Sequence, residues 1–166
     1  MGSKLNVVND VKKFQKKRVK EIPKEFKHNR VTCFPNKEKY NGIVLLEPID
    51  FSAKCEHHLV SIHGRVYIAY QPSDILIGLS QIARIVETFL NPTIETIQER
   101  ATKQICDKID NLLQPQGVMV IIKAEHECMT MRGVKQRNCR TTTSEVRGVF
   151  HEQNIKSEVF ELIKLR

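Results

Sequence analysis

The chain has 166 residues, of which 40% are hydrophobic and 28% charged, so it can build one sizeable core but is too short for two ordinary domains. No apolar run approaches the roughly 20 residues of a membrane-spanning helix, and charged residues interrupt the apolar stretches at the start of the chain, which excludes a secretion signal. Five cysteines, an odd number, indicate a reducing compartment and predict a cytoplasmic protein.

The net charge of +8 is concentrated at the start of the chain. Residues 1–40 contain 12 Lys and Arg against 4 Asp and Glu, whereas residues 41–166 contain 15 of each. We therefore divide the chain into a basic, partly helical N-terminal segment (1–40) and a single folded domain (41–166). An arm that binds nucleic acid is one interpretation of the segment. We favour a solvated helix face, because Val7, Val8, Val11 and Phe14 recur at helical spacing.

Two strands and two helices are predicted after residue 40. Residues 42–51 form an apolar run that predicts a strand bent near Pro48. Residues 60–70 alternate between apolar and polar side chains, which is typical of a half-buried antiparallel strand. Ser80 is suited to cap a helix with apolar positions between Ile82 and Leu90. A longer helix has an apolar face that runs from Ile94 to Leu113.

Further strands are predicted in the last third of the chain, at 118–122 and 141–150, with a short helix at 156–165. The order of strand, strand, two helices, strand, strand predicts an α+β fold in which the helices cover one face of a small antiparallel sheet. Such a sheet has two unpaired edges, so we expect the protein to assemble with copies of itself.

Two short clusters contain residues that bind metals. Cys55 and His58 are three residues apart in the first cluster, the spacing at which a turn can direct a thiolate and an imidazole at one ion, and Cys128 lies in the second cluster. Two cysteines and one histidine with an open fourth position are typical of a catalytic rather than a structural zinc site. His57 and His126 would then be left to carry protons at neutral pH.

Other interpretations of these clusters stay open at this stage. Cysteine and histidine are often simply buried, and clusters 70 residues apart need not meet in space. A Cys-His nucleophile is a second alternative, although no local signature supports it. Zinc deaminases of nucleosides are excluded, because they require a C-x-x-C pair that this chain lacks.

The stretch from residue 55 to residue 150 resembles GTP cyclohydrolase I. The motifs that carry the resemblance are CEHH at 55–58, GLSQIARIVE at 78–87, QERATKQI at 98–105, AEHECMTMRG at 124–133 and TTTS at 141–144. The resemblance implies the tunnelling fold (T-fold), in which sheets from several subunits join into a barrel, with two pentameric rings stacked as a homodecamer. It also implies the zinc-dependent conversion of GTP and water to 7,8-dihydroneopterin triphosphate and formate.

The resemblance assigns roles to individual residues. It implies that Cys55, His58 and Cys128 bind zinc. His57, His126 and Ser80 are implied as catalytic residues, with Ser80 near the ribose and phosphates. Glu99, Gln98 and Gln81 are implied as substrate-binding residues. Glu99 would accept hydrogen bonds from guanine, a pairing that adenine cannot reciprocate. Arg84 and Arg132 would hold the triphosphate, since guanidinium groups pair well with phosphate.

One position departs from the family pattern: Gln81 stands where the family commonly has a lysine. The loss of a cation beside a polyanionic ligand is expected to weaken triphosphate binding or to slow the rearrangement after ring opening. Two alternatives to the full reaction therefore stay open. One is an enzyme that opens the purine ring without completing the pterin, or that acts on another purine nucleotide, and the other is a non-catalytic zinc-containing binding module. The pathway served, whether folate, tetrahydrobiopterin or deazaguanine synthesis, is not fixed by these motifs.

Overall fold

The computed structural model describes residues 32–165 of the chain. The prediction of a helical, basic N-terminal segment falls mostly on residues 1–31, outside the described residues. Residues 33–35 form a short strand, so part of the predicted segment pairs with the folded domain. In the described part of the chain, no helix combines the length and the apolar character needed to cross a membrane.

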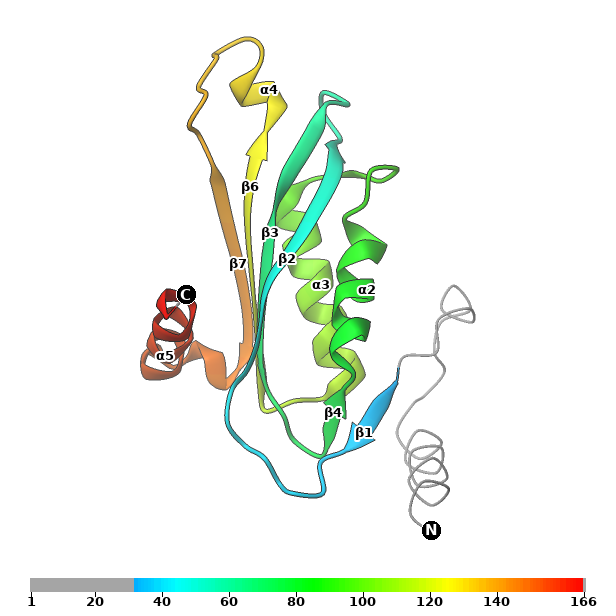
Figure 1. Cartoon of the computed structure of the whole chain (residues 1–166), viewed down its shortest axis with the longest axis vertical. Helices are drawn as coiled ribbons and strands as arrows, with labels where there is room; N and C mark the ends of the chain where they lie inside the picture. The colour runs from blue at the N-terminus through cyan, green and yellow to red at the C-terminus, as the bar shows by residue number, and fades with distance from the viewer. Residues whose placement is uncertain (1–31, 166) are drawn as a thin grey trace.

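A five-stranded sheet forms the centre of the molecule (Figure 1). Its order is β5-β2-β3-β6-β7, and all neighbours are antiparallel except the short β5, which runs parallel to β2. The strands are β2 (Val44–Cys55), β3 (Ser61–Gln71), β5 (Glu95–Thr96), β6 (Gly117–His126) and β7 (Thr141–Gly148). A separate pair joins β1 (Cys33–Pro35) to β4 (Ile75–Ile77).

The predicted strands are confirmed, but β2 and β6 extend beyond the predicted residues, β7 ends at Gly148, and the pairing of β2 is irregular. β2 continues beyond residue 51 to Cys55, so the first metal-binding cluster begins at the end of a strand. The pairing register of β2 with β3 shifts between Leu46 and Ile49, around Pro48. Because proline cannot donate a hydrogen bond to the ladder, a bulge at this point is expected.

Both predicted helices begin at different residues from those expected. α2 (Leu79–Phe89) has Gly78 at its N-cap and no side-chain cap, so the prediction that Ser80 caps this helix is wrong. α3 (Gln98–Leu113) begins four residues after Ile94, because residues 95–96 pair with β2 as β5. Apolar periodicity alone cannot distinguish the last residues before a helix from its first turn.

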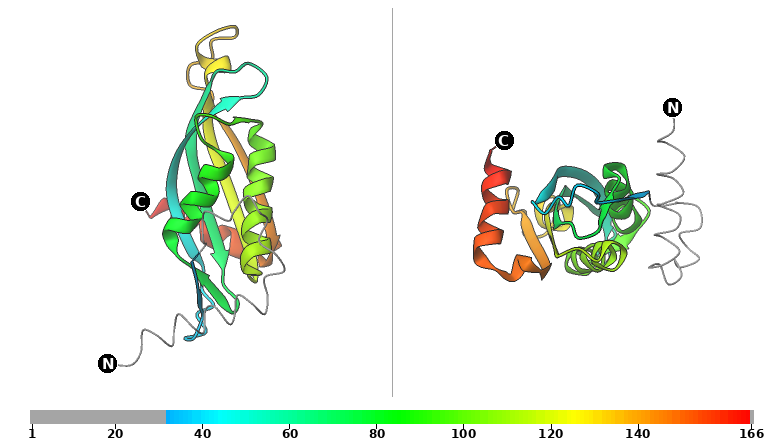
Figure 2. Two further views of the ribbon diagram at one scale, coloured as in Figure 1. Left: turned by 90° about the vertical axis from the view of Figure 1, so that its right-hand side faces the viewer. Right: turned by 90° about the horizontal axis from the view of Figure 1, so that it is seen from below.

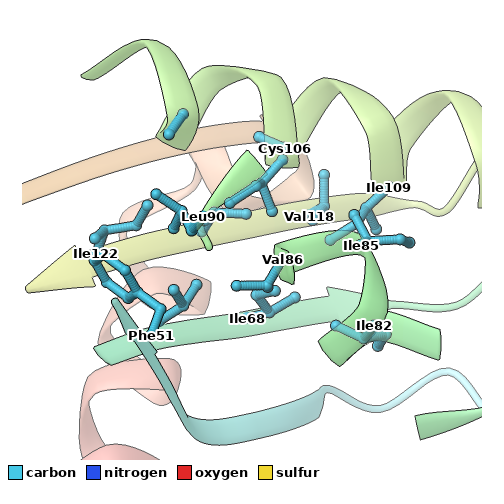
Figure 3. Packing of buried hydrophobic residues seen from close by; sticks show 14 of the residues in the cluster. Phe51, Ile68, Ile82, Ile85, Val86, Leu90, Cys106, Ile109, Val118 and Ile122 are labelled. Carbon is cyan, nitrogen blue, oxygen red and sulfur yellow. The ribbon is translucent and has the colours of Figure 1, made fainter. Parts of the chain in front are cut away.

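The main core lies between these two helices and one face of the sheet (Figure 3). Ile82, Ile85 and Val86 of α2 and Ile109 of α3 are buried against Ile68 and other sheet residues. Their spacing of three and four residues places them on one face of each helix. This layer fixes α3 against the sheet, and with it the position of residues at the start of α3.

A second, smaller core lies on the opposite face of the sheet, where α5 (Gln153–Lys164) packs (Figure 2). A 3-10 turn (Val149–His151) leads from β7 into this helix and buries Phe150 completely. The other buried residues of this core include Ala69, Met119 and Val159. The sequence predicted the helix but not the face that it covers. The α+β prediction is therefore confirmed, with helices on both faces of the sheet.

Candidate active site

The two clusters separated by 70 residues meet at one end of the sheet (Figure 1). β2 ends at Cys55, and a turn leads to β3, which begins at Ser61. In the pairing of β3 with β6, Ile62 lies opposite His126. Cys128 follows His126 by two residues, in the short helix α4 (Glu127–Thr130). Adjacent antiparallel strands thus bring the second cluster beside the first.

Cys55, His58 and Cys128 form a compact group of donors. Sγ of Cys55 lies 3.8 Å from Nδ1 of His58, and the ligand atoms of all three residues lie within 4.8 Å of one another. Four-coordinate zinc with sulfur and nitrogen ligands separates its donors by about 3.5 to 3.8 Å, so a small contraction would close the group on an ion. Among residues 32–165, this is the one group of three or more His, Cys, Asp or Glu that could hold a metal.

The chemistry of the donor set fits a soft divalent cation. Thiolates and imidazole select zinc over magnesium or calcium, which prefer oxygen ligands. Burial, followed by the nearby Cys55 thiol, raises the pKa of the Cys128 thiol. A cation bound between the two sulfur atoms would reverse this effect, because it favours both thiolates. Three protein ligands leave a fourth position open for water or substrate.

His126 lies next to this group and is held by Gln98. Nε2 of His126 is 2.8 Å from Oε1 of Gln98. The amide nitrogen of Gln98 donates to the carbonyl oxygens of Ile122 and Thr141 and to the hydroxyl of Thr143, which fixes the orientation of the amide. Its Oε1 must therefore accept from Nε2–H of His126, so the neutral imidazole has its lone pair at Nδ1.

The electrostatics at His126 favour the neutral imidazole. Burial lowers the pKa of His126, and the negative charge of Glu99 opposes part of that shift. A neutral imidazole with a free Nδ1 lone pair can accept a proton at neutral pH.

Gln98 has different partners from the substrate contact that the sequence predicted. Its side chain is only 2% exposed, and its amide is engaged by β6, β7 and His126. The single sequence offers no signal for this contact, because Gln98 and His126 lie on separate elements. The role that the structure supports for Gln98 is to orient His126.

The remaining predicted residues at this end are exposed. His57 packs edge-on against the His58 ring, with ring centroids 6.2 Å apart. Glu99 lies in the first turn of α3. Arg132 donates a hydrogen bond of 3.4 Å to the carbonyl oxygen of His58, so the loop after α4 contacts the metal-binding turn. Metal donors, two histidines, a carboxylate and a guanidinium group thus share one end of the sheet.

Sequence reasoning missed an ion pair that fastens the metal-binding turn. Oε2 of Glu56 lies 2.6 Å from a guanidinium nitrogen of Arg100, and the Glu56 amide donates to the carbonyl oxygen of Thr96. Both residues stand inside the motifs already quoted, CEHH and QERATKQI, which could have suggested a contact. The pair joins the turn to the start of α3.

α2 begins beside β4, at the end of the sheet that lies away from α4 and from the turn between β2 and β3 (Figure 1), and its first half bears Ser80, Gln81 and Arg84. β3 alone, which connects the two ends, spans on the order of 30 Å. Ser80 and Arg84 are exposed. Gln81 is 8% exposed, and its Oε1 has no hydrogen-bond partner among the described residues. Within one chain, these three residues do not meet the metal donors.

Comparisons with known proteins agree with these motifs. A sequence model of the family GTP cyclohydrolase I matches residues 7–164. GTP cyclohydrolase 1 of Bacteroides fragilis is 42% identical over 129 residues, which are 78% of this chain and 66% of that protein. GTP cyclohydrolase 1 of Clostridium perfringens is 45% identical over 126 residues, 75% of this chain and 67% of that protein. The matched part is thus about two thirds of the length of these relatives.

A solved structure supports the fold. The crystal structure of the archaeosine synthase QueF-Like in the apo form superposes with a TM-score of 0.53, at 14% sequence identity, over 64% of this chain and 93% of that chain. At this identity the likeness concerns the fold alone, and it confirms the predicted tunnelling fold. The family match covers nearly the whole chain, and the two relatives are more than 40% identical to it over three quarters of its length, so the chain belongs to the GTP cyclohydrolase I family.

Proposed function

We propose that this protein is an enzyme that converts GTP and water to 7,8-dihydroneopterin triphosphate and formate, with zinc as its cofactor. The observation that carries the proposal is the meeting of Cys55, His58 and Cys128 beside His126 at one end of the sheet. These residues come from two motifs of the family that are 70 residues apart in the chain. Their arrangement has the donors and the proton acceptor that opening of the purine ring requires.

Zinc bound by Cys55, His58 and Cys128 would supply a Lewis acid that activates water for attack on the purine ring. The residues of the chain supply the proton transfers. His126 is oriented by Gln98 so that Nδ1 can accept a proton, and the lowered pKa of His126 keeps the ring neutral at pH 7. His57 is exposed beside the metal donors, where it can exchange protons with solvent.

Guanine recognition is proposed for Glu99. Its exposed carboxylate lies in the first turn of α3, beside the partial positive charge of the helix terminus. An ionised carboxylate accepts two hydrogen bonds, as the N1–H and 2-amino groups of guanine require, whereas adenine presents no such pair of donors. The residue thus provides a physical basis for selecting GTP over ATP.

The triphosphate site is proposed to combine residues from two subunits. Arg132 lies at the metal end, whereas Arg84, Ser80 and Gln81 lie at the far end of the same chain. If all four contact one substrate, a second copy must place its α2 beside the first copy's metal donors. The two-residue strand β5 and the eight-residue strand β7 are the outer strands of the sheet, and they leave edges that copies can pair. We therefore propose a homo-oligomer, with two pentameric rings as the expected form.

A second candidate function follows from Gln81. This residue stands where the family commonly has a lysine, and it is buried in the first turn of α2. A missing cation would affect the steps after ring opening, in which the triphosphate and ribose move. The alternative is an enzyme that releases formate without completing the pterin. A cytoplasmic location stays a prediction of the sequence.

The test is to incubate the full zinc-loaded chain with GTP and to measure formate and the pterin separately. We expect both products in equal amounts, and we expect Cys128→Ser to lose bound zinc and both products together. Formate without pterin would favour the second candidate. If a chain with one bound zinc forms neither product, both candidates are contradicted, and an enzyme that acts on another purine nucleotide or a non-catalytic binding module is favoured.

A further inference from the structure

Glu127 lies between His126 and Cys128 in the chain, but its side chain points toward the opposite metal-binding segment. Oε2 of Glu127 accepts a hydrogen bond of 3.1 Å from the backbone N–H of Ser61. Its Oε1 lies 3.5 Å from Nε2 of His63. Ser61 begins β3 and follows His58 by three residues. One carboxylate thus connects the helix that bears Cys128 to the turn that bears Cys55 and His58.

This contact lies just beyond the end of the regular ladder. The pairing of β3 with β6 ends at Ile62 opposite His126, so no strand partner extends to Ser61 on that side. The carboxylate of Glu127 takes the place of a backbone carbonyl for the Ser61 amide. A hydrogen bond to a charged acceptor is stronger than one to a neutral carbonyl. The bond therefore continues the connection between the two segments where the ladder has stopped.

The metal donors depend on such a connection because α4 is short. This helix has four residues, too few to hold Cys128 in place by its own hydrogen bonds, and its N-cap residue makes no side-chain cap. The other two donors are fixed by the strand and turn hydrogen bonds around Cys55, including those of Cys55 with Val60 and Leu59. Movement of α4 relative to this turn would separate Cys128 from the other donors.

We propose that Glu127 is a positioning residue of the metal centre, which holds Cys128 at closing distance from Cys55 and His58 through its hydrogen bond to the Ser61 amide. The proposal rests on the proposed function of these three residues as metal ligands. It concerns the retention of the metal, not a step of the reaction. His63 supports the carboxylate from its other side, although the exposure of this pair limits its contribution.

The test measures the rate at which the zinc-loaded full chain releases zinc to a chromogenic chelator. Three variants separate the hydrogen bond from the charge. Glu127→Leu removes both, Glu127→Gln keeps an acceptor of the same length without the charge, and Glu127→Asp keeps the charge but is one methylene too short. Glu125→Gln is the charge-matched control, because the Glu125 carboxylate makes no hydrogen bond or ion pair among residues 32–165.

We expect Glu127→Leu to release zinc about 10 to 100 times faster than the unmodified chain, the usual effect of losing a residue that supports metal ligands. Glu127→Asp is expected to lie close to Glu127→Leu, whereas Glu127→Gln and Glu125→Gln should stay within about threefold of the unmodified chain. If Glu127→Leu does not fold, as judged by circular dichroism, the comparison of Glu127→Asp with Glu127→Gln is sufficient.

Two results would overturn this proposal while leaving the metal site intact. One is an unchanged release rate in Glu127→Leu. The other is fast release from Glu127→Gln together with slow release from Glu127→Asp, because charge rather than the hydrogen bond would then hold the metal. If the unmodified chain binds no zinc at all, the proposed metal centre fails first.

Discussion

His126 shows how a buried neighbour can define the chemistry of a histidine. Because the amide nitrogen of Gln98 faces two carbonyl oxygens, its Oε1 faces the imidazole, and the tautomer of His126 follows. Neither fact is visible in the motif that contains Gln98, where the neighbouring Glu99 and Arg100 are exposed. The structure thus shows Gln98 bonded to His126, a contact that the sequence did not predict, while the predicted contact of Gln98 with substrate stays a prediction.

At this scale we predict that Gln98→Met lowers kcat by about 10- to 100-fold, the usual range for removing a partner that orients an active-site side chain. KM for GTP and zinc content should change little, because the metal donors and Glu99 do not depend on the amide. Steady-state kinetics with metal analysis gives the measurement.

Gln116→Met is the matched control for Gln98→Met. Gln116 also donates from its side-chain amide to a backbone carbonyl, that of Pro72, but at the end of the sheet away from the metal donors. Both variants lose hydrogen bonds that join neighbouring segments, so both should lower the free energy of unfolding. Only Gln98→Met should lower kcat. An equal loss of kcat in both variants would indicate that reduced stability, not the loss of the contact with His126, lowers the activity.

At the scale of elements, a charged network joins α3 to β7. Arg147 of β7 lies 2.7 Å from Asp107 of α3 and also contacts Glu145, and Lys103 pairs with Asp107 along the helix. The hydrogen bond from Lys103 is the main cause that lowers the pKa of the Asp107 carboxyl; burial opposes it, and the hydrogen bond from Arg147 lowers the pKa further. The network connects the helix layer to the outer strand of the sheet.

We therefore predict an acid-dependent loss of stability that Asp107→Asn removes. A carboxyl whose pKa is lower in the folded than in the unfolded protein contributes stability above its ordinary pKa of 3.8, and this contribution is lost as the pH falls through the lower, folded value. The free energy of unfolding, measured by urea denaturation between about pH 6 and pH 2, should decline less in Asp107→Asn than in the unmodified chain. Because the carboxylate is about one third exposed, the effect is expected to be modest.

Asp110→Asn serves as the control for this pH dependence. Asp110 lies on the same helix, and its side chain makes no ion pair among the described residues. It should retain the pH dependence of the unmodified chain. If the free energy of unfolding falls equally with pH in the unmodified chain, Asp107→Asn and Asp110→Asn, the network with Arg147 adds nothing to stability.

At the scale of the whole molecule, the proposed active site has two parts that lie apart in one folded chain. The metal donors lie at the end of the sheet near α4, and α2 begins near the other end of the sheet (Figure 1). Two variants that each disable one end, Cys128→Ser and Arg84→Ala, should therefore complement each other. If copies assemble at random from equal amounts of both, about a quarter of the sites join an intact metal end to an intact α2. Co-expressed variants should then show about a quarter of the normal activity, against almost none for either variant alone.

The complementation experiment also has a clear contrary outcome. The control is a mixture of the two variants that were folded separately and are kept at a concentration at which oligomers do not exchange subunits. If the co-expressed variants are no more active than this mixture, no active site is shared between copies. A sedimentation measurement on the same sample reports whether the copies assemble. Assembly without complementation would limit the proposed active site to the residues at the metal end of one chain.

Local patterns were sufficient where one element decides its own structure. The alternation at 60–70 and the β-branched run at 118–122 predicted β3 and β6, because burial on one or both faces of a sheet constrains side chains directly. Helix starts were less well predicted: Ser80 does not cap α2, and Ile94 lies before α3. At these points, pairing with another strand and the close approach of Gly78 to Thr32 override the local preference.

The sequence by itself determined the four long strands, the helical faces, the α+β class and the residue types of a metal centre, since each depends on spacing along a single segment, but not the short strands β1, β4 and β5. Only the tertiary structure decided that Cys55 and Cys128 meet, that Gln98 orients His126, that Glu127 bridges two segments, and that Ser80 and Arg84 lie far from them. Each of these depends on strand register or on the direction of a helix relative to the sheet. Register and direction follow from the burial of many residues at once, so no single motif contains them.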